Sequence, residues 1–145
     1  MTDMKFLVIG LGSMGKRRIR NLQHLGVKDV IGLDFREDRR EEAHTKYGVK
    51  TFSDYGSALS AKPDVFIIST PPDRHAEYAL LAAKANKHFF TEADVLDDGM
   101  DELIEILDSK SIIGAPSVTP IFRQSTKIIK SLLDEEKIGK IYSFS

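Results

Sequence analysis

A six-residue run with three glycines constrains the fold of this chain more than any other segment. The run is Gly10-Leu11-Gly12-Ser13-Met14-Gly15, and it lies between the apolar segment Lys5–Ile9 and an amphipathic stretch from Met14 to Leu25. An unalternating apolar segment is typical of a parallel strand covered on both faces. Glycines permit a tight turn and a close approach of helix to strand. The sequence therefore predicts a strand, a turn and a helix in succession.

The same alternation continues along the chain. Further apolar segments predict strands at Val30–Leu33, Val49–Phe52, Val65–Ile68 and His88–Thr91, with a sixth strand beginning at Ile112. Helical spacing of apolar residues predicts helices over 37–47, around Ala76–Ala83, over 101–109 and around Ile128–Leu133. Right-handed crossovers then give an α/β fold of the Rossmann type, with a doubly wound, mostly parallel six-stranded sheet flanked by helices. The expected strand order is 3-2-1-4-5-6.

The glycine run also carries a functional hypothesis. In such a turn the second glycine lets the backbone approach a diphosphate, and the amide end of the following helix favours negative charge. Glycine runs also occur in plain turns, which is the structural alternative. The position directly after the first strand favours dinucleotide binding by Gly10, Leu11, Gly12, Ser13, Met14 and Gly15.

Asp34 ends the second strand, 19 positions after Gly15. A carboxylate there can accept hydrogen bonds from the adenosine ribose hydroxyls; the alternative is a turn or helix-cap aspartate. Because a carboxylate repels a 2′-phosphate, we expect NAD, with NADP as the alternative. Arg36 remains a cofactor candidate, whereas Arg39 and Arg40 are expected on a solvated helix face, as are the basic residues 16–18.

Polar residues also follow the fourth and fifth strands. Ser69, Thr70, Pro71 and Pro72 lie where the strand order reverses, which is where open α/β sheets bind ligands. The alternative is a proline-terminated strand followed by a helix cap. His75 is either a polar contact at the cofactor edge or a surface histidine. Glu92, at the end of the fifth strand, is expected to bind nicotinamide-ribose hydroxyls, with an exposed strand-end acid as the alternative.

Composition excludes several classes of function. Cysteine is absent, which removes disulfides and thiol chemistry, and a net charge of −1 predicts no nucleic-acid partner. No apolar run approaches the length of a membrane span, and the first residues do not resemble a signal peptide. We therefore expect a cytoplasmic protein without membrane partners. His24, His44 and His88 lack metal-ligand spacing, so no metal is expected.

Several segments together resemble the N-terminal domain of the glucose–fructose oxidoreductase / inositol dehydrogenase / MocA family. They are the glycine run, Asp34, the segment from Ser69 to His75, the segment from Ala83 to Glu92, and the tail from Leu132 to Ile141. The resemblance implies an NAD or NADP site formed by the residues above. It also implies hydride transfer to or from a sugar, cyclitol or related polyol, and a C-terminal substrate domain.

The chain departs from this family after Glu92. The family usually has Glu-Lys-Pro where this chain has Glu92-Ala93-Asp94, so the role of the lysine is unfilled. No catalytic residue is assigned. We expect residues 1–138 to form the cofactor domain and residues 139–145 to begin the first strand of a substrate domain that lies beyond this chain. The full protein is expected to be a homo-oligomer, and the alternative function is a non-catalytic dinucleotide-binding module.

Overall fold

The computed structural model describes residues 3–93 and 99–142, and its centre is one parallel sheet. The strands are β1 (Phe6–Ile9), β2 (Val30–Leu33), β3 (Lys50–Phe52), β4 (Val65–Ile68), β5 (His88–Thr91) and β6 (Gly114–Pro116). Their order is β3-β2-β1-β4-β5-β6, and every pair is parallel. The predicted strand order is therefore confirmed. The order reverses between β1 and β4, so a crevice forms at the carboxyl ends of these strands.

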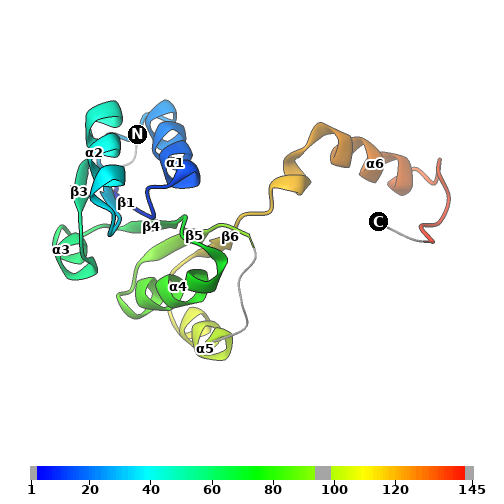
Figure 1. Cartoon of the computed structure of the whole chain (residues 1–145). Coiled ribbons are helices and arrows are strands. Elements are labelled where there is room, and N and C mark those ends of the chain that lie inside the picture. Colours follow the sequence, from blue (N-terminus) through cyan, green and yellow to red (C-terminus); the bar gives the residue numbers. More distant parts are fainter. Residues whose placement is uncertain (1–2, 94–98, 143–145) are drawn as a thin grey trace.

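Helices cover the two faces of the sheet (Figure 1). α1 (Ser13–His24) and α2 (Glu37–Tyr47) lie on one face, where Val8, Ile19 and Ala43 belong to one buried cluster. α3 (Tyr55–Ser60), α4 (His75–Lys84) and α5 (Met100–Ser109) supply the other face, where Leu7 and Phe66 belong to a second cluster. Because each central strand contributes to both clusters, its residues are apolar without alternation, as the sequence predicted.

Local signals explain where the elements end. Gly48 follows α2 with φ of +68°, a left-handed conformation that favours glycine. α3 was absent from the sequence prediction, and its cap is the Asp54 side chain, which accepts a hydrogen bond from the Ser57 amide at 2.8 Å. A short 3-10 turn, Pro72–Arg74, leads into α4. The helix predicted around Ala76–Ala83 therefore begins at His75, directly after this 3-10 turn.

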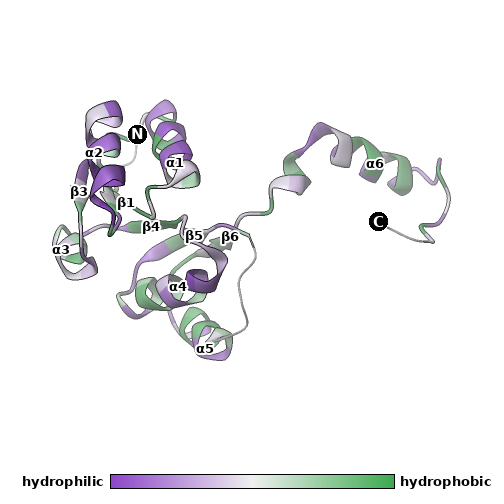
Figure 2. Cartoon of the chain, in the orientation of Figure 1, coloured by the Kyte–Doolittle hydropathy of each residue, from purple (hydrophilic) through white to green (hydrophobic). Residues whose placement is uncertain are grey.

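The C-terminal part differs from the sequence prediction. β6 begins at Gly114, after Ile112 and Ile113, and the packed ring of Phe89 leaves no room for a Cβ at position 114. A 3-10 turn (Thr119–Phe122) then leads to α6 (Gln124–Asp134). Figure 1 shows α6 standing away from the sheet, and its apolar side is green in Figure 2.

The predicted final strand does not form where the structure describes it. Ile141 and Tyr142 are exposed and belong to no strand, and residues 143–145 lie outside the described part of the chain. Asp94, which departs from the family pattern, also lies outside it. Within residues 3–93 and 99–142, no helix has both the length and the apolar character that crossing a bilayer requires.

Candidate functional site

The turn after β1 requires two of its three glycines for steric reasons. Gly10 has φ of +86°, and a Cβ at this position would lie 2.6 Å from the carbonyl oxygen of Ser69. A Cβ on Gly15 would lie 1.8 Å from the carbonyl oxygen of Gly10. Gly12 is different, because the nearest atom to a Cβ there is Nη1 of Arg39 at 3.7 Å. The fold itself thus requires Gly10 and Gly15, whereas a Cβ on Gly12 would make only ordinary van der Waals contact with Arg39.

The amino end of α1 begins at Gly12 and has no capping side chain. Gly12 is the N-cap residue, and the first turn of the helix contains no acidic residue. The first amides of a helix have no partner within the helix, so they carry partial positive charge available to an anion. Ser13, Met14 and Gly15 form this first turn. The arrangement is suited to a phosphate group.

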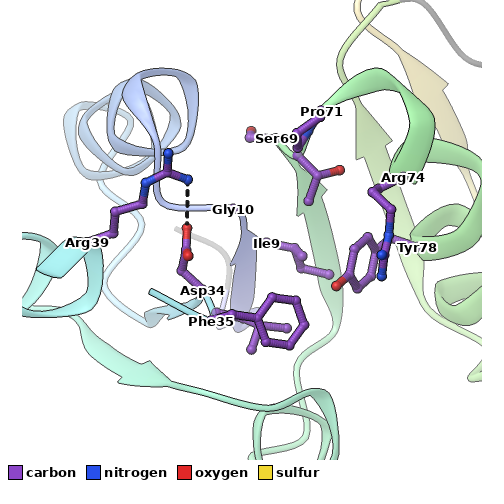
Figure 3. Close-up of a pocket in the computed structure, with 11 residues that line it drawn as sticks. Ile9, Gly10, Asp34, Phe35, Arg39, Ser69, Pro71, Arg74 and Tyr78 are labelled. Atoms are coloured by element: carbon purple, nitrogen blue, oxygen red, sulfur yellow. Dashed lines mark hydrogen bonds and ion pairs between the residues drawn. The ribbon is translucent and has the colours of Figure 1, made fainter. Parts of the chain in front are cut away.

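Asp34 is held next to the glycine turn by hydrogen bonds from two loops. Its side chain is 7% exposed. Oδ2 accepts a hydrogen bond from the Leu11 amide at 2.8 Å, and Oδ1 accepts one from the Arg36 amide at 2.9 Å. Nη1 of Arg39 lies 3.4 Å from Oδ2 (Figure 3). A carboxylate has about four acceptor positions; Oδ2 already accepts from two donors, so Oδ1 retains one position for a ligand hydroxyl.

A cavity of about 200 Å³ opens beside Asp34. It lies at the carboxyl ends of β1, β2 and β4, and Figure 3 shows its side chains converging from both sides of the crevice. Its lining consists of Ile9, Gly10, Leu33, Asp34, Phe35, Arg39, Ser69, Thr70, Pro71, Arg74 and Tyr78. Burial raises the pKa of the Tyr78 phenol, so this side chain stays neutral. The cavity combines apolar and aromatic walls with one carboxylate and the guanidinium groups of Arg39 and Arg74, a combination that suits a nucleoside.

The loop after β4 contains several buried polar atoms without partners. His75 is only 1% exposed, and its Nε2 donates a hydrogen bond to the Thr70 carbonyl oxygen at 2.8 Å. The alternative of a surface histidine is therefore wrong, because this ring lies beneath the loop. Nδ1 of His75, Oγ of Ser69 and Oγ1 of Thr70 have no hydrogen-bond partner among the described residues. Buried polar atoms normally have partners, so this cluster is consistent with a ligand-binding loop. Pro71 and Pro72 are exposed beside it.

Glu92 ends β5 and forms an ion pair that the sequence analysis did not predict. Nε and Nη2 of Arg18 donate to its two oxygens at 2.6 and 2.7 Å, and the side chains are 20% (Arg18) and 15% (Glu92) exposed. The expectation of a solvated face for residues 16–18 is therefore wrong for Arg18. Lys16 also has a partner, since it bonds to Glu42 on α2. Ala93, next to Glu92, is exposed.

The arginines after β2 differ from their expected roles. Arg36 is exposed and pairs with Asp38 at 2.6 Å, on the same turn. Arg39 lines the cavity, so its expected position on a purely solvated face is wrong. Arg40 donates to the carbonyl oxygens of Asp34 and Phe35 at 2.9 and 2.8 Å and fixes the end of β2. The sequence spacing of the three arginines did not predict their different positions, because the curvature of the turn decides which side chain reaches the crevice.

No group of three or more potential metal ligands occurs within residues 3–93 and 99–142. The doubly wound sheet, the glycine turn under an uncapped helix and the carboxylate at the end of β2 define a nucleotide-binding domain of the Rossmann type. The sequence profile described as "Oxidoreductase family, NAD-binding Rossmann fold" matches residues 4–111. The chain belongs to this oxidoreductase family and carries its NAD-binding domain.

Individual relatives support this assignment. Myo-inositol 2-dehydrogenase of Thermotoga maritima is 29% identical over 94% of this chain and 42% of its own length. The crystal structure of myo-inositol 2-dehydrogenase from Lactobacillus plantarum has a TM-score of 0.87 at 27% identity, over 97% of this chain and 43% of that one. Scyllo-inositol dehydrogenase from Lactobacillus casei, solved with NAD(H) and scyllo-inositol, has the same fold, with a TM-score of 0.85 at 23% identity over 97% of this chain and 43% of that one. The chain thus spans less than half the length of these relatives.

Proposed function

We propose that this chain is the cofactor half of an oxidoreductase that transfers hydride between NAD and a CH–OH group of a sugar, cyclitol or related polyol. The observation that carries the proposal is the pairing of Asp34 with the uncapped end of α1. A single hydrogen bond from the Leu11 amide to Asp34 fixes the distance between the diphosphate position and the ribose position. The inositol dehydrogenases among the relatives support the substrate class.

In this proposal the first half of the sheet binds adenosine diphosphate. The first-turn amides of α1 and the backbone of residues 10–12 hold the diphosphate, and the acceptor position that remains free on Oδ1 of Asp34 binds a ribose hydroxyl. The cavity between Phe35, Arg39 and Tyr78 takes the adenine base. Asp34 also favours NAD over NADP, because its negative charge repels a 2′-phosphate. Arg36 serves no direct role in the apo geometry, since Asp38 neutralises it.

The second half binds the nicotinamide nucleoside. The unpartnered hydroxyls of Ser69 and Thr70 offer hydrogen bonds to it, and Pro71, Pro72 and the buried His75 fix the shape of that loop. The two acceptor positions of Glu92 that Arg18 leaves free are suited to ribose hydroxyls. When bound, the nicotinamide supplies the hydride chemistry, and the protein positions it and excludes competing reactions.

Substrate binding and proton transfer belong to other parts of the protein in this proposal. Residues 1–138 form the cofactor domain, and residues 139–145 begin a substrate domain that follows. Such a division is supported by the fraction of the relatives' length that this chain matches, which is less than half. The group that moves the hydroxyl proton is assigned to that second domain, and the assembled protein is proposed to be a homo-oligomer.

A second candidate function is a non-catalytic domain that binds NAD as a structural or regulatory ligand. The observation that favours it is Ala93, which carries neither a charge nor a hydrogen-bond donor on its side chain. The full-length protein separates the two candidates. Reduction of NAD with myo-inositol or another polyol supports the enzyme. Tight NAD binding without reduction by any of a panel of polyols and sugars supports the binding module.

The cofactor assignment is tested by Asp34→Asn, which keeps the size of the side chain and removes its charge. Calorimetric titration should show NAD affinity lowered about tenfold or more, the usual cost of losing a hydrogen bond to a charged group. The preference for NAD over NADP should also fall. Glu41→Gln, which removes an exposed carboxylate from α2, is the matched control and should leave both affinities unchanged. Unchanged NAD and NADP affinities in Asp34→Asn would remove the ribose role.

A further inference from the structure

We propose that the ion pair between Arg18 and Glu92 sets the relative affinity of this domain for oxidised and reduced cofactor. The inference rests on the proposed function, because it assumes that the nicotinamide binds over the second half of the sheet. It assigns to Arg18, a helix residue outside the glycine run, a role in tuning the charge around the reactive ring.

Contacts with neighbouring residues hold the Arg18–Glu92 ion pair in one position. Both guanidinium contacts to the carboxylate are short, at 2.6 and 2.7 Å, and both side chains are largely buried. The guanidinium also lies over the ring of Phe90, 4.8 Å from its centre, and Nη2 lies 3.4 Å from Oγ of Ser117. A bidentate pair that is also stacked has little freedom to reorient. The positive charge therefore stays fixed beside the end of β5.

The Arg18–Glu92 ion pair lies at the carboxyl ends of the parallel strands, where the cofactor is proposed to bind. The Glu92 amide donates to the Ile68 carbonyl oxygen at 3.1 Å, so Glu92 lies beside the end of β4 and the start of the Ser69–Thr70 loop. A dinucleotide bridges the two halves of such a sheet. With Asp34 on the first half binding adenosine, the nicotinamide lies over the ends of β4 and β5. Glu92 is the acid at that position.

Charge then distinguishes the two redox forms. The nicotinamide ring is positively charged when oxidised and neutral when reduced. An isolated carboxylate at the end of β5 would favour the oxidised form, and an isolated guanidinium would oppose it. The pair presents almost no net charge, and Glu92 still has acceptor positions for ribose hydroxyls. The domain therefore binds both forms with similar affinity, which suits a reaction that must release either one.

The experiment measures dissociation constants of the full chain for NAD⁺ and NADH, by calorimetry and by NADH fluorescence. Arg18→Met leaves the carboxylate alone and should raise the affinity for NAD⁺ relative to NADH about fivefold, the order expected for one unit charge nearby in a partly solvated site. Glu92→Gln leaves the cation alone and should shift this ratio in the opposite direction. The double variant should return close to the wild-type ratio.

Controls separate the charge effect from loss of structure. Lys16→Met removes another α1 cation, the one that pairs with Glu42, and should leave the ratio unchanged. Arg18→Lys keeps the charge and should also preserve it. A purely structural role would weaken NAD⁺ and NADH equally in every variant. That result, with AMP binding intact, would overturn the inference, as would an Arg18→Met ratio equal to that of the wild type.

The proposed function fails in a different way. If the wild-type chain binds neither AMP nor NAD⁺, the cofactor site itself is wrong. If it binds both, and the ratio shifts in opposite directions in the two single variants, both the site and the role of the pair are supported.

Discussion

The two halves of the sheet differ in whether the polar side chains at their ligand edge already have hydrogen-bond partners. In the first half, formed by β1 to β3, the two oxygens of Asp34 are already hydrogen-bonded to loop amides, and a cavity lies beside them. In the second half, formed by β4 to β6, the hydroxyls of Ser69 and Thr70 are buried without partners among the described residues. The first half is thus organised by its own hydrogen bonds, whereas the second half retains polar groups for contacts that the described residues do not supply.

One helix from each half, α1 and α6, shows the same contrast. α1 packs on the sheet, and Ile19 within it is fully buried. α6 stands away from the sheet, and Ile128 and Ile129 are about half exposed. An apolar helix face normally packs against another element. α1 is thus part of the core of its half, whereas α6 contributes little to the packing of this domain.

The largest effect is expected at Gly15. Gly15→Ala would bring a Cβ to 1.8 Å from a backbone oxygen, so the first half must distort, at an expected cost of about 4 kcal/mol or more in the free energy of unfolding. Urea denaturation measures this loss. Gly12→Ala is the control: its Cβ has room, so stability should change little while NAD affinity falls. Equal stability of the Gly15→Ala variant and the wild type would contradict the packing described for this turn.

The next largest effect is the difference in stability between substitutions on α1 and on α6. Ile19→Ala empties a fully buried position on α1 and should cost about 2–5 kcal/mol of unfolding free energy. Ile129→Ala on α6 should change it by less than about 0.5 kcal/mol, the usual range for an exposed site. Urea denaturation of both variants tests the contrast. Similar losses would show that α6 packs as firmly as α1.

A smaller effect is expected at Thr70. Thr70→Val removes a buried hydroxyl that lacks a partner, so the melting temperature of the free protein should stay the same or rise. NAD affinity should fall about fivefold, the range of one neutral hydrogen bond. Calorimetry and thermal melting together make the test. A lower melting temperature with unchanged NAD affinity would mean that the hydroxyl serves the fold.

The smallest effect concerns Glu42, which joins α1 to α2. Hydrogen bonds from Lys16 and Lys46 lower its pKa to about 2. Because the pKa is lower in the folded state, the stabilisation is present above the ordinary value of 4.5 and is lost as pH falls from there toward 2. Glu42→Gln should make stability depend slightly less on pH across this acid range, as measured by the melting temperature at each pH. Glu41→Gln, exposed on the same helix, should keep the wild-type slope.

The fold was largely predictable from the sequence because its signals are local. Strands covered on both faces are uniformly apolar, helices have spaced apolar residues, and the handedness of crossovers then determines the strand order. The glycine turn was predictable because two of its positions admit no side chain. α3 was missed because a helix of six residues gives too short a pattern, although Asp54 and Ser57 carried a capping signal.

The parts that could not be predicted depend on contacts between distant residues. Arg18 and Glu92 are 74 positions apart, so their pairing follows only from the packing of α1 on β1 and β4, from where the Arg18 side chain reaches the end of β5. The burial of His75 depends on the path of the chain at Pro71 and Pro72, which brings the His75 ring under the Thr70 carbonyl group. The apolar stripe of α6 was visible in the sequence, but a stripe identifies a helix face and not the surface that it contacts.

The hydrogen bond from the Leu11 amide to Asp34 has a consequence for redesigning cofactor preference. Exchanging Asp34 for a small apolar residue, to admit a 2′-phosphate, would also remove the acceptor from two loop amides, of which that of Leu11 is buried. Such an exchange weakens the apoprotein together with its selectivity. Serine, threonine or asparagine preserves an oxygen for at least one of these amides, so a durable switch toward NADP starts from one of them.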